Sequence, residues 1–177
     1  GLHSLNKDRQ AFANPVSPYN PIGKCPNMLD NGLLCIMVDQ NGTIKITDLE
    51  TGFTYAGLNV FTDTGSSGDM WIHREPVHNQ TITSYGCNAD ISLIRNSCLS
   101  ATLKIDVVLD IPDGLTEDRK SRSCYTTPMK VSTEVTLAKG SKRADFKVCF
   151  ENKCKEHKLI VSFPTGIKTD HSRSQVP

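Results

Sequence analysis

The chain has 177 residues and a mass of 19.5 kDa, which suits one domain with a single core. Hydrophobic residues make up 37% and charged residues 22%, so the composition is that of a globular protein rather than a disordered or membrane-spanning one. The 20 basic and 19 acidic residues nearly cancel, which argues against nucleic acid or an anionic membrane as a partner.

The first 29 residues are polar and rich in proline, with Pro15, Pro18, Pro21 and Pro26. Proline lacks a backbone N–H and fixes φ, so it interrupts helices and central strands. No charged segment followed by an apolar one marks a signal peptide at the N-terminus. We therefore expect residues 1–29 to form a linker or extended segment, and residues 30–177 to form the folded domain.

From residue 30 onward, short segments alternate between apolar and polar residues, as half-buried strands do. In the longest of them, Leu103, Ile105, Val107 and Leu109 would share one face of a strand. Asn41-Gly42 is a strong hairpin signal, and it predicts two residues with positive φ. The predicted strands are 33–38, 43–48, 53–55, 89–94, 101–111, 130–137, 144–151 and 157–163. Many short strands separated by turns predict an all-β fold, an antiparallel β-sandwich.

Residues 62–79 break this alternation, and they predict a long loop that includes five Gly, Ser or Asp residues at 65–69. Trp71, the only tryptophan, falls in this loop together with His73. Aromatic rings bind the apolar face of sugars, so Trp71, Asp69 and His73 are candidate substrate-binding residues. Trp71 could instead pack beneath its own loop. The carboxylates Asp63, Asp69 and Glu75 favour turn formation over catalysis in such a context.

Other kinds of site find little support in the sequence. Cys149, Cys154 and His157 are spaced widely for zinc and lack a fourth ligand, so core packing is favoured for them. Ser66-Ser67 has no strand-to-helix context for a nucleophile. We therefore expect no catalytic and no metal-binding residue in this chain. The odd count of seven cysteines matches no disulfide scaffold, and it favours reduced thiols and a cytoplasmic location.

Several blocks of the chain occur in the order found in one enzyme family. They are Asp30–Leu34, Asn41–Gly52, Gly57–Asp63, Gly68-Asp69, Asp118–Ser123, Thr133–Leu137 with Lys139–Ser141, and His157–Asp170. Together these blocks resemble the start of the large C-terminal β-domain of the glycoside hydrolase family 38 α-mannosidases. The resemblance covers most of residues 30–170.

The resemblance implies a partial galactose-mutarotase-like supersandwich within a zinc-dependent retaining α-mannosidase. The aspartate nucleophile and the zinc ligands would lie in the α/β catalytic and helical domains, outside this chain. The β-domain would supply one aromatic loop to the mannose pocket, and Trp71 stands where an aromatic residue is expected. The neighbouring Met70 and Ile72 depart from the family pattern. A sandwich that ends before the family's domain closes would leave a sheet edge exposed, through which the chain could self-associate.

Three kinds of function follow from these observations. The first is a non-catalytic β-domain fragment that buttresses a mannosidase and lines its mannoside pocket. The second is a stand-alone carbohydrate-binding module that uses Trp71. The third is a sandwich that serves protein–protein interaction. The ordered series of family blocks favours the first, although a fold alone does not determine a function.

Overall fold

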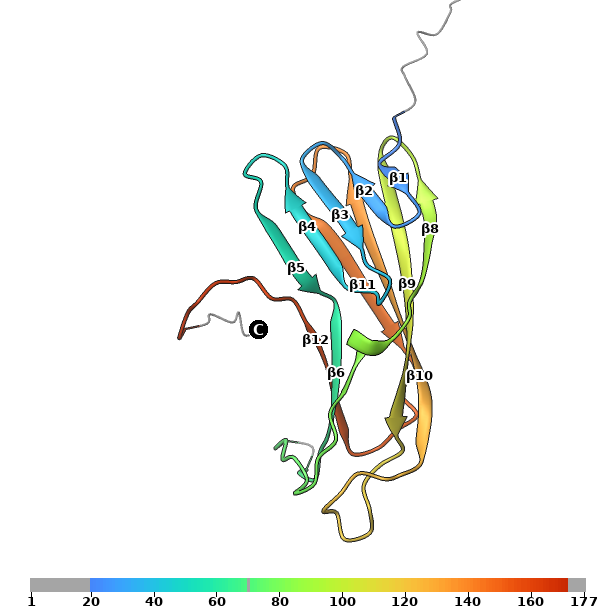
Figure 1. Cartoon of the computed structure of the whole chain (residues 1–177), viewed down its shortest axis with the longest axis vertical. Helices are drawn as coiled ribbons and strands as arrows, with labels where there is room; N and C mark the ends of the chain where they lie inside the picture. Colours follow the sequence, from blue (N-terminus) through green and yellow to red (C-terminus); the bar gives the residue numbers. More distant parts are fainter. Residues whose placement is uncertain (1–19, 70, 172–177) are drawn as a thin grey trace, which may run out of the picture.

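The computed structural model describes residues 20–69 and 71–171, and its regular structure is almost entirely β (Figure 1). Every pairing between its strands is antiparallel. The strands are β1 (Gly23–Cys25), β2 (Met28–Asp30), β3 (Leu34–Val38), β4 (Ile44–Asp48), β5 (Thr54–Leu58), β6 (Val60–Gly65), β7 (Ile82–Thr83), β8 (Asp90–Asn96), β9 (Ser100–Pro112), β10 (Thr126–Ala138), β11 (Ala144–Phe150) and β12 (His157–Ser162). A single 3₁₀ turn, η1 (Ser84–Gly86), follows β7.

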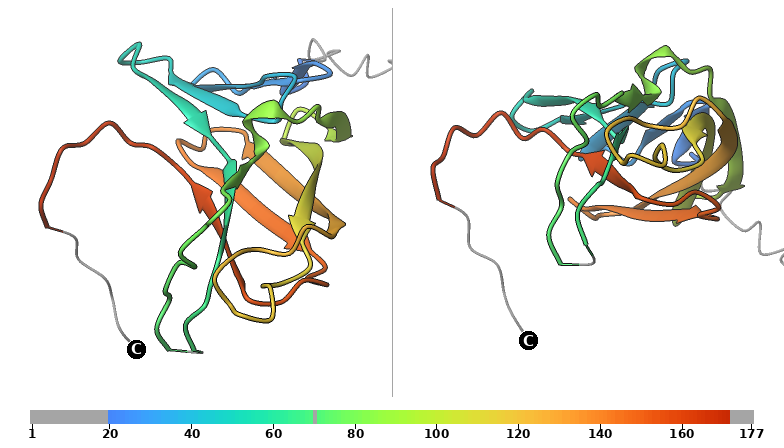
Figure 2. Two further views of the ribbon diagram at one scale, coloured as in Figure 1. Left: turned by 60° about the horizontal axis from the view of Figure 1, so that its bottom comes forward. Right: turned by 90° about the horizontal axis from the view of Figure 1, so that it is seen from below.

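The part of the molecule that lies at the top in Figure 1 is a sandwich, and Figure 2 shows its two layers. One layer has the strand order β1-β2-β3-β4-β5, and the other has the order β11-β10-β9-β8. Leu29, Ile36 and Ile44 of the first layer share one buried cluster with Leu103 and Ile105 of the second. The predicted all-β, antiparallel sandwich is confirmed, and so is the inward face of β9.

A third, smaller sheet with the order β12-β6-β7 extends the fold downward. Strand β6 follows β5 after one residue, Asn59, so the chain leaves the first sheet and enters the third without a loop. Phe61 of β6 packs in a second buried cluster with Leu109, Ile111 and Met129 from the long strands β9 and β10. The third sheet therefore shares its core with the lower halves of β9 and β10.

Three sequence expectations need correction. Strands β1 and β2 begin before residue 30, the expected start of the domain; Pro26 lies in the turn between them and interrupts neither. Residues 60–65 form β6, although 62–65 were expected to be loop; the polar Asp63 there is fully buried. Only Gly42 of the Asn41-Gly42 pair has positive φ, because the hairpin loop spans residues 39–43. The expected linker at residues 1–19 lies outside the described residues.

All seven cysteines fall within the described part of the chain, and each is a free thiol. Burial raises the pKa of Cys35, Cys87 and Cys154, and a nearby aspartate adds to the effect in each case. Among the described residues, no helix is long and apolar enough to cross a membrane.

Candidate functional site: the loop that carries Trp71

The loop of residues 66–81, here called the Trp71 loop, joins β6 to β7 at the lower end of the molecule (Figure 1). Trp71 is 87% exposed. Asp69 organises the tip, since its Oδ1 accepts hydrogen bonds from the backbone N–H of Trp71 at 2.9 Å and of Ile72 at 2.8 Å. These two bonds, with a smaller contribution from the charge of Arg74, lower the pKa of Asp69. The carboxylate is therefore ionised at neutral pH and shapes the backbone beside Trp71.

The base of the loop is closed by hydrogen bonds between its two arms. The Ser67 N–H donates to the carbonyl of Arg74 at 2.7 Å, and Ser67 Oγ donates to the same oxygen at 3.1 Å. His73 Nδ1 lies 3.2 Å from Ser66 Oγ. Gly68 admits no side chain, because a Cβ atom there would lie 1.8 Å from the carbonyl oxygen of Ile72. The two arms are thus held together at residues 66–67 and 73–74, and Trp71 is exposed to solvent.

A buried cluster of polar side chains, Asp63, Arg122 and His157, lies beneath the loop. Asp63, which is 0% exposed, pairs through Oδ1 with Arg122 Nη2 at 2.5 Å and through Oδ2 with His157 Nδ1 at 2.5 Å. The second ring nitrogen of His157 lies 3.0 Å from Asn152 Oδ1. Arg122 Nη1 donates to the carbonyl of Gln80 at 2.8 Å. The cluster therefore joins β6, β12 and the return arm of the Trp71 loop at one point.

The structure brings the three candidate residues Trp71, Asp69 and His73 together on one loop. The alternative that Trp71 packs beneath this loop is wrong, because its side chain is exposed. Asp63, which the sequence placed beside them as a loop carboxylate, is instead buried in an ion pair. The sequence did not predict the buried cluster, because the polar residues 62–64 are typical of a loop. The alternation of β6 was the available signal, since Phe61, Asp63 and Gly65 face inward.

The three residues weighed as zinc ligands lie in different surroundings. His157 is held by Asp63 and Asn152. Cys154 is buried in the second core cluster, whereas Cys149 is exposed on β11. Across residues 20–69 and 71–171, no three histidine, cysteine, aspartate or glutamate side chains gather as a metal ion would require.

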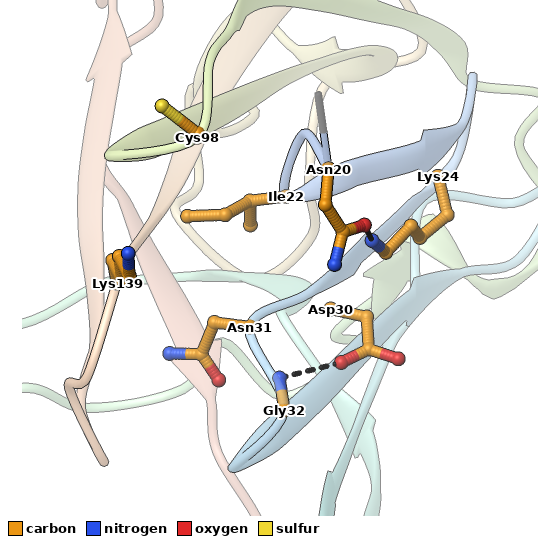
Figure 3. A pocket seen from close by; sticks show the side chains of 8 residues that line it. All are labelled: Asn20, Ile22, Lys24, Asp30, Asn31, Gly32, Cys98 and Lys139. Carbon is orange, nitrogen blue, oxygen red and sulfur yellow. Dashed lines mark hydrogen bonds between the residues drawn. The ribbon is translucent and has the colours of Figure 1, made fainter. Parts of the chain in front are cut away.

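A pocket of about 420 Å³ lies at the opposite end of the sandwich, among the β2–β3, β8–β9 and β10–β11 turns (Figure 3). Its polar groups are largely used within the protein. Asn31 Nδ2 donates to the carbonyls of Ala138 and Ser141, and the Gly32 N–H donates to Asp30 Oδ1 at 2.7 Å. This pocket is separate from the Trp71 loop and shares no residue with it.

Comparisons with known proteins converge on one family. Residues 29–177 match the model of the glycosyl hydrolases family 38 C-terminal domain. A putative mannosylglycerate hydrolase of Halalkalibacterium halodurans is 31% identical, over 78% of this chain and 17% of that protein. The crystal structure of an α-mannosidase from Enterococcus faecalis V583 superposes with a TM-score of 0.82 and 28% identity, covering 85% of this chain and 19% of that one. A second structure from this organism, of a protein in glycosyl hydrolase family 38, gives the same TM-score and identity.

The chain spans about a fifth of the length of these relatives. It is therefore similar to one domain of larger proteins. Because the family model matches well over half of the chain, the chain belongs to glycosyl hydrolase family 38, within the C-terminal domain of that family.

Proposed function

We propose that this chain is a non-catalytic β-domain of a zinc-dependent retaining α-mannosidase, in which it buttresses the catalytic domain and supplies the Trp71 loop to the mannose-binding pocket. The names of the relatives support this role, since one is an α-mannosidase and another a putative mannosylglycerate hydrolase. Zinc and the aspartate nucleophile would belong to the other domains of the parent enzyme. We assign no catalytic residue and no metal ligand to this chain.

The observation that carries the proposal is the 87% exposure of Trp71 on a loop whose arms and tip are fixed by hydrogen bonds. A protein normally buries much of an indole ring, because the ring is large and apolar. An indole held outward beside a backbone that Asp69 fixes by hydrogen bonds fits a role in contacting a ligand or a second surface. The apolar face of a mannose ring is a suitable partner for it, with Asp69 and His73 as neighbouring polar groups.

The buttressing role rests on a different surface. Strand β5 lies at the edge of its sheet. Phe53, directly before it, and Tyr55, within it, form an exposed, edge-on aromatic pair. A shallow pocket of about 190 Å³ separates this pair from Pro164 and Gly166 after β12. Free strand edges with exposed aromatic side chains favour protein contacts. The other domains of the parent enzyme would cover this edge; self-association of the separated β-domain is the alternative.

Hydrolysis of an aryl α-mannoside with added zinc tests the proposal. The 177-residue chain should show no turnover, whereas the full-length enzyme that contains it should be active. In that enzyme, Trp71→Ala should lower kcat/KM by about tenfold or more, the scale of a lost stacking contact. Tyr85→Ala, which removes an exposed aromatic ring outside the Trp71 loop, is the matched control and should leave kcat/KM unchanged. Unaltered kinetics of the Trp71 variant, or turnover by the 177-residue chain, would refute the assignment.

A further inference from the structure

We infer that Arg119 and Glu156 form a clasp that fixes the position of the Trp71 loop, and that both are positioning residues for the mannose pocket. This inference rests on the proposed function of Trp71. Neither residue would touch the substrate. Their role would be to hold the loop in the orientation in which Trp71 meets the sugar.

The clasp joins three separate segments at the lower end of the fold. The Arg119 guanidinium pairs with the Glu156 carboxylate, and Arg119 Nη2 also donates to the carbonyl of Ser67 at 3.2 Å. The backbone carbonyl of Glu156 accepts the N–H of Ser66 at 2.7 Å. Glu156 Oε2 accepts the N–H of Leu115 at 3.2 Å. The Trp71 loop, the 113–125 loop and the 151–156 turn are therefore tied together through one pair of side chains.

The attachment points lie at the base of the arm that leads to Trp71. Ser67 is the residue that closes the loop through Arg74, so a shift of Ser67 would carry both arms with it. On the opposite side, the His78 N–H donates to the carbonyl of Lys120, one residue after Arg119, at 2.8 Å. The 113–125 loop thus grips the Trp71 loop on both its outgoing and its return arm.

The backbone conformation of the clasp is unusual. Arg119 has φ 57° and Glu156 has φ 53°, and the only other non-glycine residue with positive φ in the described ranges is Asn59. The left-handed region is unfavourable for long side chains, and glycine or asparagine would occupy it with less strain. Strained residues of this kind concentrate at functional sites. Two strained residues, 37 positions apart in sequence, have side chains that meet, and this points to a role for the contact itself.

Stability does not explain the clasp. The side chains of Arg119 and Glu156 are 49% and 33% exposed, and ion pairs this accessible contribute little to folding. The buried cluster of Asp63, Arg122 and His157 lies nearby and provides the stabilising connection of the same region. The exposed clasp adds a connection to the loop that folding does not require.

Substitution of Arg119 by glycine separates positioning from stability, because glycine removes both the side chain and the left-handed strain. In the 177-residue chain, Arg119→Gly should leave the urea midpoint unchanged or raise it. Amide hydrogen exchange within residues 66–81 should nevertheless accelerate by about tenfold, as expected when a local opening becomes easier. The single tryptophan gives a second readout, since the fluorescence anisotropy of Trp71 should fall. Arg143→Ala is the control; it removes a surface pair with Asp145 in the β10–β11 hairpin and should alter neither readout.

In the full-length enzyme, Arg119→Gly should lower kcat/KM for an aryl α-mannoside by about fivefold or more, and Arg119→Lys should restore part of it. Unchanged exchange and anisotropy in Arg119→Gly would overturn the clasp. The positioning role would also be overturned if Trp71→Ala impairs the enzyme but Arg119→Gly loosens the loop without any loss of activity. If Trp71→Ala itself has no effect, the proposed function of Trp71 fails, and faster exchange in Arg119→Gly would still establish the clasp as the device that holds the loop.

Discussion

Thr133 Oγ1 donates a 3.0 Å hydrogen bond to Asn59 Oδ1, and both side chains are buried. Through this bond and two others, Asn59 contacts all three sheets of the fold. Asn59 Nδ2 donates to the carbonyl of Gly42 at 3.1 Å, in the β3–β4 loop of the first sheet. Its backbone N–H donates to the carbonyl of Ser162 at 3.0 Å, at the end of β12. Thr133 lies in β10 of the second sheet. The turn from β5 into β6 is therefore fixed by the side chain of its single connecting residue.

Asn59 has φ 64°, so its replacement separates backbone strain from lost hydrogen bonds. Asn59→Ala should destabilise the fold by about 2–4 kcal/mol, because it leaves buried polar partners unpaired and keeps an unfavourable conformation. Asn59→Gly loses the same bonds without the strain and should be about 1 kcal/mol less damaging. Urea denaturation gives both values. Thr47→Ala, which removes an exposed threonine pair, should change stability by no more than about 0.5 kcal/mol. Equal losses in the two Asn59 variants would mean that the left-handed backbone costs nothing.

The buried ion pair between Asp63 and Arg122 should be strongly non-additive under mutation. Arg122→Met removes the guanidinium partner of the buried Asp63 carboxylate and should cost about 3–5 kcal/mol, the usual loss when a buried pair is broken. The double variant Asp63→Asn with Arg122→Met removes both charges. Its loss of unfolding free energy should be smaller than the sum of the losses in the two single variants by at least about 1 kcal/mol. A double-mutant cycle in urea measures this difference. Simple additivity would contradict the close contact.

How far the sequence predicted this structure depends on the type of contact. Alternation placed β9 and β10 correctly, because their apolar residues face a core along their whole length. It failed at β6, where the inward position of Asp63 is compensated by Arg122, 59 residues away. Local periodicity carries no information about such a distant partner. The prolines of residues 1–29 likewise led to the prediction of a linker where β1 and β2 form. Pro26 lies between these two strands, and a proline in that position is compatible with a hairpin.

The candidate site was also predictable only in part, because local pattern reveals the loop but not its distant contacts. A loop with a lone tryptophan can be recognised from the absence of periodicity, and Trp71, Asp69 and His73 do lie together on it. The exposure of Trp71 depends on how the loop closes through Ser67 and Gly68, which composition does not determine. The clasp between Arg119 and Glu156 depends on three loops meeting in space, and no local pattern marks either residue.

Stability below neutral pH should depend on Asp106 of β9. Burial is the largest influence on its pKa and would raise it, but hydrogen bonds from Lys130, Ser132 and Lys104 outweigh burial and lower the pKa to about 2. Its Oδ2 lies 2.7 Å from Lys130 Nζ and 3.1 Å from Lys104 Nζ. Because the folded-state pKa lies below the usual 3.8, the stabilisation is fully present above the unfolded pKa and disappears as pH falls toward about 2.

The change should amount to about 2 kcal/mol between neutral pH and about pH 2, from a shift of nearly two units. Asp106→Asn should therefore be less stable than the wild type at neutral pH, and the two unfolding free energies should converge as the solution is acidified to about pH 2. Denaturant titrations across this range provide the comparison. Asp145→Asn, at an exposed position of β11, is the control and should follow the wild type throughout. A constant gap between Asp106→Asn and the wild type at all pH values would exclude the linkage.

Fluorescence of Trp71 in the isolated chain distinguishes a pocket-lining fragment from a stand-alone carbohydrate-binding module, because no other tryptophan contributes. An indole that is 87% exposed should be quenched by acrylamide almost as efficiently as a free tryptophan amide. Methyl α-mannoside should leave the emission unchanged up to about 10 mM, since one aromatic ring without the rest of a pocket offers only a few kcal/mol of binding free energy. Saturable binding by the 177-residue chain would instead identify a self-sufficient carbohydrate-binding module.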